Sequence, residues 1–510
     1  MNEARRVRLA RAATTVMVAY LISRVLGLGR EMIIGNQFGT TRGLDAYLAA
    51  FRVPDLIFQL IAGGALASAF IPTFTSYLAH NDEKQAWRLA SSLMNIVAIV
   101  VTVCAILAAI LAPHLVARVV VPGFTAEEQA LTVRLMRLML VSPTIFGISG
   151  IVMGILNSYQ HFLLPALAPA VYNLSIIGGA IFLAPAFGIY GLAVGVVAGS
   201  LLHLLIQIPE LRRKGLDYRP LLDIRNPGVR EVGRLMLPRM LGLATVQINF
   251  LVSTFLASGL TEGSLAALNY GWMLMLVPQG IFALAIATAA FPTFSELAAR
   301  GELQDLRGTL SETLRLILYL TIPASVGLIV LREPLIQLLL QRGRFDPSST
   351  QAVAWALQFY AFGLFAHSAL EIITRAFYSL HDTRTPVAIG VVAMALNIIL
   401  SVLLIRPLLH GGLALANSLA TIVETVVLLA ILRGRLGGID GRALLWSVGK
   451  TAVAAMVMGF GAYWFAAWAR GSHILLRGGG AVILGGILFL AASLVLRSEE
   501  IGALKGILRR

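Results

Sequence analysis

Apolar runs of about 20 residues recur along the whole chain, and no other feature constrains the fold as strongly. A helix of that length crosses a hydrocarbon core of ~30 Å. Backbone groups in lipid must bond within the protein, so spanning segments are helices or closed barrels. The runs are continuous rather than alternating, which favours helices. The sequence therefore predicts an all-α polytopic membrane protein.

Charge and composition exclude an ordinary soluble protein. Only 13% of the 510 residues are charged and 58% are hydrophobic, whereas soluble domains are about 25% charged. The net charge of +15 fits either nucleic acid or a membrane surface. Because the basic residues lie between apolar runs and form no long patch, we expect anionic phospholipid as a partner and no nucleic acid. Cys104 is the sole cysteine, so a disulfide within the chain and a cysteine-based metal site are excluded.

Fourteen spans are predicted from the apolar runs. The second and eighth are longer than a perpendicular span needs, and Pro54 and Pro278 inside them are candidate kink sites. The predicted spans are 13–36, 44–79, 90–112, 128–157, 165–186, 189–211, 231–258, 264–298, 309–331, 352–379, 386–405, 411–432, 447–469 and 477–496.

The loop lysines and arginines predict the orientation. With the N-terminus inside, most of them fall in cytoplasmic segments, the largest group in residues 212–230. Cytoplasmic loops are enriched in Lys and Arg. We therefore expect a multi-pass protein of the cytoplasmic (inner) membrane of a bacterium, with both termini in the cytoplasm.

The chain contains a repeat of about 220 residues. "AFIPTFTSYLA" (69–79) matches "AAFPTFSELAA" (289–299), and "YGLAVG" (190–195) resembles "GGLALA" (411–416). One repeat holds six spans, so the two copies point the same way. This predicts an N-terminal six-helix lobe (1–220), a C-terminal six-helix lobe (221–440), and two extra spans with a basic tail (441–510). Transporters with such halves bind substrate between them.

Charged residues lie inside the first span, in "SRVLGLGRE" (23–31). An arginine near a helix centre costs roughly 2.5–3.5 kcal/mol on insertion scales. Residues seven apart nearly eclipse on a helix, so Ser23 lies over Arg30 and Arg24 over Glu31. The span therefore has a broad polar face.

The second span adds Asp45, Arg52 and Asp55. Buried structural ion pairs are one interpretation of these charges. A cationic, water-filled cavity for an anionic headgroup is the other, and we favour it because guanidinium groups bind phosphate oxygens bidentately. At an offset of 220, the second half carries uncharged residues at these three positions. The charged face therefore belongs to one half of the chain.

Missing motifs narrow the chemistry. The sequence has no GxxxxGK[ST] phosphate loop, no HExxH, no GxSxG elbow and no TVGYG filter. The longest polar loop, about 212–230, is too short for a catalytic domain. These absences favour a secondary transporter, neither an enzyme nor dependent on a cofactor. Na⁺, H⁺ and the membrane potential all stay open as energy sources.

Several segments together resemble the signature of the MurJ (MviN) lipid II flippases. They are "SRVLGLGRE", "LDAYLAAFRVPDLI", "GGALASAFIPTF", "QRGRFD" (341–346) and "RAFYSLHDTRTP" (375–386). That family belongs to the multidrug/oligosaccharidyl-lipid/polysaccharide exporters, with two six-helix lobes and two C-terminal helices. The resemblance implies that the chain flips lipid II, the undecaprenyl-pyrophosphate-linked peptidoglycan precursor, to the outer leaflet. It places pyrophosphate contacts on Arg24, Arg30, Glu31 and Asp45, and a lipid-tail groove on the last two spans.

The sequence departs from this family at three positions. Met273 stands where several members carry an arginine, Phe58 replaces a second-span arginine of some members, and Ser401 ends a pattern that reads Asn-x-x-x-Asp elsewhere. These departures imply a smaller headgroup clamp. Another polyprenyl-linked substrate is one alternative. A drug exporter of the same superfamily is a weaker one, because an acidic cavity would be expected for it.

Overall fold

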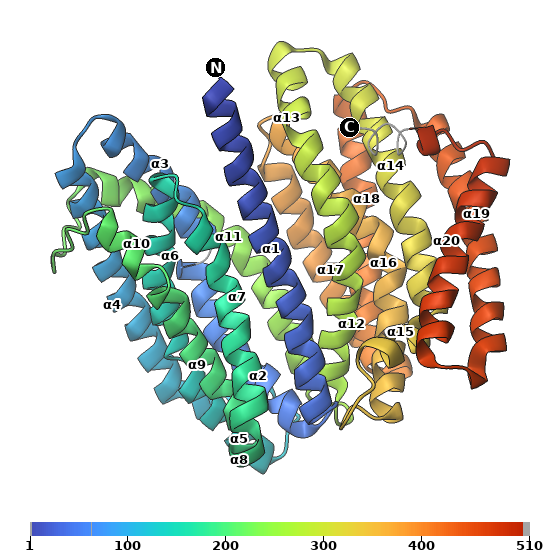
Figure 1. The fold of residues 1–510 in the computed structure, drawn as a ribbon, viewed down its shortest axis with the longest axis horizontal. Helices are drawn as coiled ribbons and strands as arrows, with labels where there is room; N and C mark the ends of the chain where they lie inside the picture. The colour runs from blue at the N-terminus through green and yellow to red at the C-terminus, as the bar shows by residue number, and fades with distance from the viewer. Residues whose placement is uncertain (1–2, 63, 503–510) are drawn as a thin grey trace. The chain divides into compact units, whose positions relative to one another are not determined.

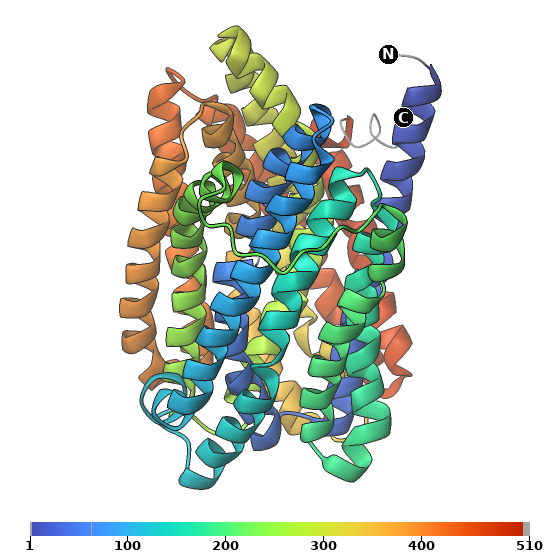
Figure 2. The same ribbon diagram turned by 90° about the vertical axis from the view of Figure 1, so that its left-hand side faces the viewer.

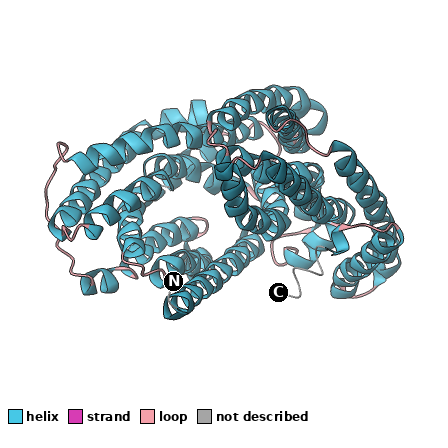
Figure 3. Cartoon of the chain, turned by 90° about the horizontal axis from the view of Figure 1, so that it is seen from above, coloured by secondary structure: helices cyan, strands magenta, loops and turns pink. Residues whose placement is uncertain are grey.

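A computed structural model describes residues 3–62 and 64–502. Within them the chain is helical and contains no β-strand (Figure 3). The helices form two compact units, residues 1–262 and 263–510. This confirms the predicted all-α class.

Unit 1 contains the first eleven α-helices (Figure 1). In chain order the elements are α1 (Glu3–Phe38), α2 (Arg42–Ile57), the π-helix η1 (Phe58–Ala62), α3 (Gly64–Ala79), α4 (Glu83–Leu115), the π-helix η2 (Val116–Val120), α5 (Ala126–Met139), α6 (Ser142–Ser158), α7 (Leu163–Gly178), the π-helix η3 (Gly179–Leu183), α8 (Ala184–Phe187), α9 (Tyr190–Leu205), α10 (Ile208–Arg213) and α11 (Pro227–Ala257).

Unit 2 contains the other nine α-helices (Figure 1). They are α12 (Ser264–Pro278), the π-helix η4 (Gln279–Ala283), α13 (Leu284–Arg300), α14 (Leu303–Val330), α15 (Arg332–Leu339), α16 (Pro347–Ser379), α17 (Arg384–Leu408), α18 (His410–Arg435), α19 (Gly441–Trp468), the 3₁₀-helix η5 (Ala469–Gly471), the π-helix η6 (Leu475–Gly480) and α20 (Ala481–Val495). The two C-terminal helices α19 and α20 pack against each other, and α19 also packs against α14.

The helices agree with the predicted spans. Eleven helical stretches in the described residues are long and apolar enough to cross a membrane, and each overlaps one predicted span. Helices also occupy the three remaining predicted segments, as α1, as α2 with η1 and α3, and as α11. The compact units divide after Glu262, so α11 packs with unit 1, against α2 and α3. The lobe boundaries derived from the repeat stay a prediction.

The turns between helices repeat with the same offset as the sequence. The Tyr159 amide N–H donates a hydrogen bond to the Ile155 carbonyl, and 221 residues later the Leu380 amide N–H donates to the Ala376 carbonyl. The turn before α9 and the turn before α18 also share their hydrogen bonds at this offset. Left-handed backbone recurs in step, in the pairs Asn81 and Gly301, Gln160 and His381, and Gly188 and Leu409. The two halves are therefore built from one structural pattern.

Each of the two predicted kink sites is followed by a π-helical turn. η1 begins four residues after Pro54, and η4 begins directly after Pro278. The two π-helical turns lie 221 residues apart, so this irregularity also belongs to the repeat.

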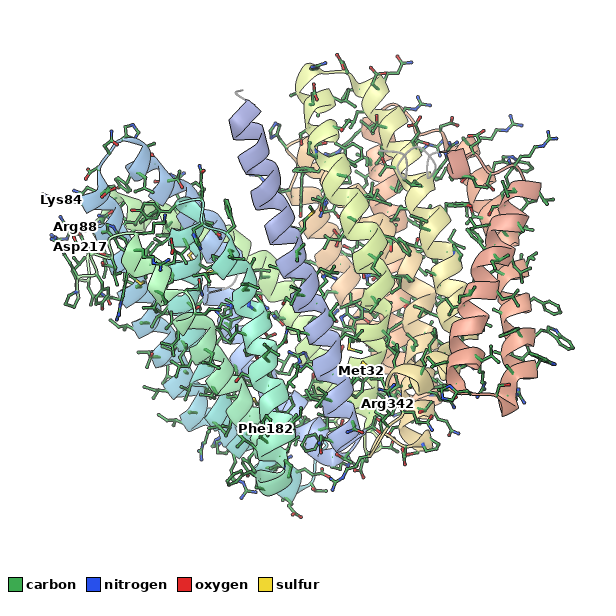
Figure 4. The ribbon with its side chains drawn as sticks, viewed as in Figure 1. Met32, Lys84, Arg88, Phe182, Asp217 and Arg342 are labelled. Atoms are coloured by element: carbon green, nitrogen blue, oxygen red, sulfur yellow. The ribbon has the colours of Figure 1, made fainter. Side chains whose placement is uncertain are left out.

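The predicted cytoplasmic segments of unit 1 gather at one end of it. Lys84 and Arg88 on α4 and Asp217 in the segment between α10 and α11 extend from that end, and Phe182 lies near the opposite one (Figure 4). Arg88 forms an ion pair with Asp223 at 2.7 Å. The irregular segment between α10 and α11 runs across unit 1 (Figure 2), and Asn95 of α4 donates to its Leu221 carbonyl at 2.9 Å.

The motif "RAFYSLHDTRTP" forms a capped turn between α16 and α17. Asp382 accepts hydrogen bonds from the Thr385 hydroxyl at 2.5 Å, the Thr385 amide at 3.0 Å and the Arg384 amide at 2.9 Å. Arg435 from α18 also donates to this carboxylate. The hydrogen bonds from Thr385, together with the nearby Arg435 guanidinium, lower the pKa of Asp382 from 3.8 to about 2.

We expect this cap to weaken in acid. A carboxyl group whose folded-state pKa lies below its unfolded value stabilises the fold above the unfolded pKa, and that stability is lost as the pH falls through the folded pKa. The Tm difference between wild type and Asp382→Asn should therefore stay constant above about pH 4 and shrink toward about pH 2. Thermal unfolding in detergent measures it. A difference independent of pH would contradict the assigned role.

Candidate functional site

Arg30 on α1 is held by two partners. Its Nε donates to Glu31 Oε1 at 3.1 Å, and its Nη2 donates to the same oxygen. Its Nη1 donates to Asn173 Oδ1 on α7 at 3.0 Å. A guanidinium has five N–H donors, so two are left for a ligand. The side chain is 26% exposed and can therefore be reached.

Asn173 also joins Arg30 to the start of the motif. Its Nδ2 donates to the Ser23 carbonyl at 3.2 Å. Ser23 and Arg30, which were predicted to lie on one face of α1, are thus connected to each other through Asn173 of α7. α1 and α7 pack closely here, and a Cβ placed on Gly27 would lie 3.6 Å from Asn173 Nδ2. The small residue allows this approach.

Arg24 differs from Arg30. Its side chain is exposed, and it makes no hydrogen bond or ion pair with any residue that the structure describes. It does not pair with Glu31, although the two share a stripe, because Glu31 bonds to its sequence neighbour Arg30. Since an unpaired cation in an apolar segment is costly, Arg24 is the residue of the motif most available to an anion.

Arg52 and Asp55 on α2 contact α11. Arg52 Nε donates to Thr254 Oγ1 at 3.0 Å, and its guanidinium lies 5.3 Å from the centre of the Phe250 ring. Asp55 accepts from Gln247 at 3.3 Å. Both predicted residues are therefore oriented by polar groups of the seventh predicted span.

Aromatic residues connect these two groups of charges. Tyr47 of α2 and Tyr172 of α7 both lie close enough to Arg30 to interact with it electrostatically. Tyr172 also interacts electrostatically with Asp55. Asp45 lies in the first turn of α2, only 1% exposed, and takes part in interactions within the protein. The predicted residues of unit 1 therefore occupy neighbouring surfaces of α1, α2, α7 and α11.

Sequence reasoning missed the contribution of α7. Tyr172 and Asn173 interrupt the apolar run "LLPALAPAVYNLSIIG", and this was the available signal. Thr254 was missed because a threonine in a span usually bonds its own helix, as it also does here to the Phe250 carbonyl at 2.9 Å.

Unit 2 has a different character at the related positions. Trp272 packs on His367, with ring centres 5.5 Å apart. Ser401, at the end of the pattern that reads Asn-x-x-x-Asp elsewhere, donates to Asn397 Oδ1 at 3.3 Å. In the described part of the chain, no group of three or more His, Cys, Asp or Glu side chains could hold a metal ion.

Solved structures place the fold in a class of transporters. An inward-facing multidrug resistance MATE family transporter of the MOP superfamily aligns with 83% of this chain and 98% of its own, at a TM-score of 0.68 and 15% identity. At that identity the likeness shows the fold alone. A lipid II flippase MurJ in an inward closed conformation aligns with 94% of this chain and 98% of its own, at a TM-score of 0.81 and 25% identity.

Sequence comparison then gives the family. The model of the lipid II flippase MurJ family matches residues 34–477. The probable lipid II flippase MurJ of Vibrio cholerae serotype O1 is 31% identical over 467 residues, 88% of each chain. The lipid II flippase MurJ of Burkholderia cenocepacia is 29% identical over 435 residues, 84% of each chain. The chain belongs to the MurJ family.

Proposed function

We propose that this protein is a lipid II flippase. It moves the undecaprenyl-pyrophosphate-linked disaccharide-peptide from the inner to the outer leaflet of the cytoplasmic membrane by alternating access, for cell wall synthesis. Membership of the MurJ family supports this function. The observation that carries it to a site is the unpaired guanidinium of Arg24, on the same helix as the partly open guanidinium of Arg30.

The pyrophosphate is bound by these two arginines. Arg24 offers its whole fork, and Arg30 offers the two N–H groups that Glu31 and Asn173 leave free. Bidentate contacts of this kind suit phosphate oxygens. Glu31 and Asn173 fix the orientation of the planar Arg30 guanidinium, so little conformational entropy is lost when the headgroup binds.

The other predicted residues shape the surrounding surface. Arg52 and Asp55 are oriented by α11. Ser23 lies on α1 with the two binding arginines, and Asp45 lies on α2 with Arg52 and Asp55. The lipid tail lies along α19 and α20, since α19 exposes Trp446, Phe460 and Trp464 and α20 exposes Ile483, Ile487 and Leu494. Anionic phospholipid contacts the basic cytoplasmic loops, and both chain termini are cytoplasmic.

A second candidate is a flippase for another polyprenyl-linked glycan. Met273 stands where several MurJ proteins carry an arginine, which favours a site adapted to a different headgroup. Both functions use the same pyrophosphate chemistry and differ in the sugar and peptide.

Complementation of a bacterium depleted of its own lipid II flippase tests which of the two candidate functions is correct. We expect the wild-type gene to restore growth and to restore access of lipid II to the outer leaflet. The purified protein in proteoliposomes should flip lipid II faster than a polyprenyl-pyrophosphate that lacks the peptide. Equal rates for both lipids would favour the second candidate, and no flipping of either would contradict the proposed function.

A further inference from the structure

Glu424 stands by itself in the middle of α18. It is the only acidic residue of this helix, whose other ionisable residues are His410, Arg433 and Arg435 at the two ends. Its carboxylate makes no hydrogen bond or ion pair with the residues that the structure describes. Carboxylates inside spans are rare and usually functional, because their charge is costly in an apolar surrounding.

The helices around Glu424 bring few charges to it. A Cβ on Gly390 would lie 3.3 Å from Glu424 Oε1, so the carboxylate rests against the backbone of α17. α17 has arginines only at its two ends and no acidic residue, and α12 has no charged residue at all. On α16 the charged pair Glu371 and Arg375 bond to each other at 3.9 Å.

His367 is the titratable group at the same depth. α16 and α18 run parallel, because His410 contacts the Ala352 carbonyl and Thr425 donates to the Ala366 carbonyl at 3.1 Å. His367 Nε2 lies 3.1 Å from Asn417 Oδ1 and 3.3 Å from Thr421 Oγ1.

Asn417 and Thr421 share the face of α18 that carries Glu424, seven and three residues before it. A line of polar groups therefore leads along this face to the carboxylate.

The structural repeat gives a second, independent observation. The position of Glu424 corresponds to His203 in unit 1, and the position of His367 corresponds to Phe146, each at an offset of 221. In unit 1 these two residues pack together, with ring centres 5.3 Å apart. His203 Nδ1 forms a hydrogen bond with Ser149 Oγ at 2.7 Å. Both halves thus place a titratable side chain at this position, and among the residues that the structure describes only the one in unit 2 has no hydrogen-bond or ion-pair partner.

From this geometry we propose that Glu424 is a proton-binding site that couples proton movement to the transport cycle, which rests on the proposed function. The carboxylate takes one proton from water on one side of the membrane and becomes a neutral carboxyl. It gives the same proton to water on the other side after the conformational change. No other bond forms or breaks. The neutral form favours α17 and α18 closed around it, and the charged form favours a state that water reaches.

Infrared difference spectroscopy on the full protein in liposomes tests the binding step. We expect one carboxyl C=O band that changes with pH in the wild type, and that Glu424→Gln removes. Glu371→Gln is the matched control and should keep the band, since Glu371 is paired with Arg375. Should the glutamine variant fold poorly, Glu424→Asp should shift the band. A spectrum unchanged by both Glu424 variants would overturn the proposal.

An imposed pH gradient tests the coupling step. The rate of lipid II flipping in proteoliposomes should change severalfold with the gradient in wild type and in Glu371→Gln. In Glu424→Gln the rate should be independent of the gradient. A Glu424→Gln protein that still responds fully to the gradient would refute coupling through this residue. If wild type flips no lipid II under any condition, the proposed function fails, and the infrared result alone decides whether Glu424 binds the proton.

Discussion

Replacing Arg24 with alanine is expected to abolish complementation of a flippase-depleted strain while leaving the protein in the membrane. The side chain is exposed and unpaired, so its loss removes no internal contact. A hydrogen bond to a charged group contributes about 1.5–3 kcal/mol, which corresponds to about a 10- to 100-fold loss of affinity for the headgroup. Lipid II binding to the purified variant measures this loss.

Arg30→Ala should fail equally, for a second reason. Besides losing two donors to the ligand, it leaves the Glu31 carboxylate, whose side chain is 14% exposed, without its cation. Arg24→Lys should retain part of the activity, since lysine keeps the charge but lacks the fork. Arg300→Ala is the control, because this arginine is 60% exposed and pairs only with Glu296 on its own helix. Full complementation by both Arg24→Ala and Arg30→Ala would exclude a role in substrate binding.

Much of the fold followed from the sequence because the membrane leaves so few choices. Apolar length gave the helices and their order, and the repeat gave the equivalence of the halves. The turns were less accessible. Gln160 and His381 both adopt left-handed backbone at the same position of the repeat, although neither residue type demands it. That conformation is imposed by how the flanking helices meet, which the local sequence does not encode.

The sequence predicted candidate residues for the site but not which of them pair. Helical periodicity placed Arg24 over Glu31, yet Glu31 bonds to Arg30, whose long side chain can bend back to its neighbour. The partner of Arg30 on α7 is 143 residues away, and the partner of Arg52 on α11 is 202 residues away. Such contacts depend on tertiary packing, and a single sequence does not show which distant residues meet.

The largest expected effect on stability is at Gly412, where α18 begins. A Cβ there would lie 2.2 Å from the Leu404 carbonyl oxygen of α17. Because the obstacle is backbone, the helices must move apart, and overpacking of this kind typically costs about 1–3 kcal/mol. We expect Gly412→Ala to lower the Tm and the yield of monodisperse protein in detergent. Gly434→Ala on the same helix is the control, since nothing lies within 4 Å of its Cβ position.

The repeat makes the same prediction in the other unit. Gly191 occupies the matching position, 221 residues earlier, and a Cβ there would lie 2.5 Å from the Ala184 amide nitrogen. Gly191→Ala should therefore destabilise the protein to a similar degree, although its flanking sequence differs. A Tm equal to that of wild type in either variant would contradict the prediction, because it would show that the backbone of this turn accommodates the added Cβ without loss of stability. Equal losses in both would mean that the protein depends to a similar degree on the contact between α17 and α18, which also holds Glu424 against α17, and on its counterpart between α8 and α9.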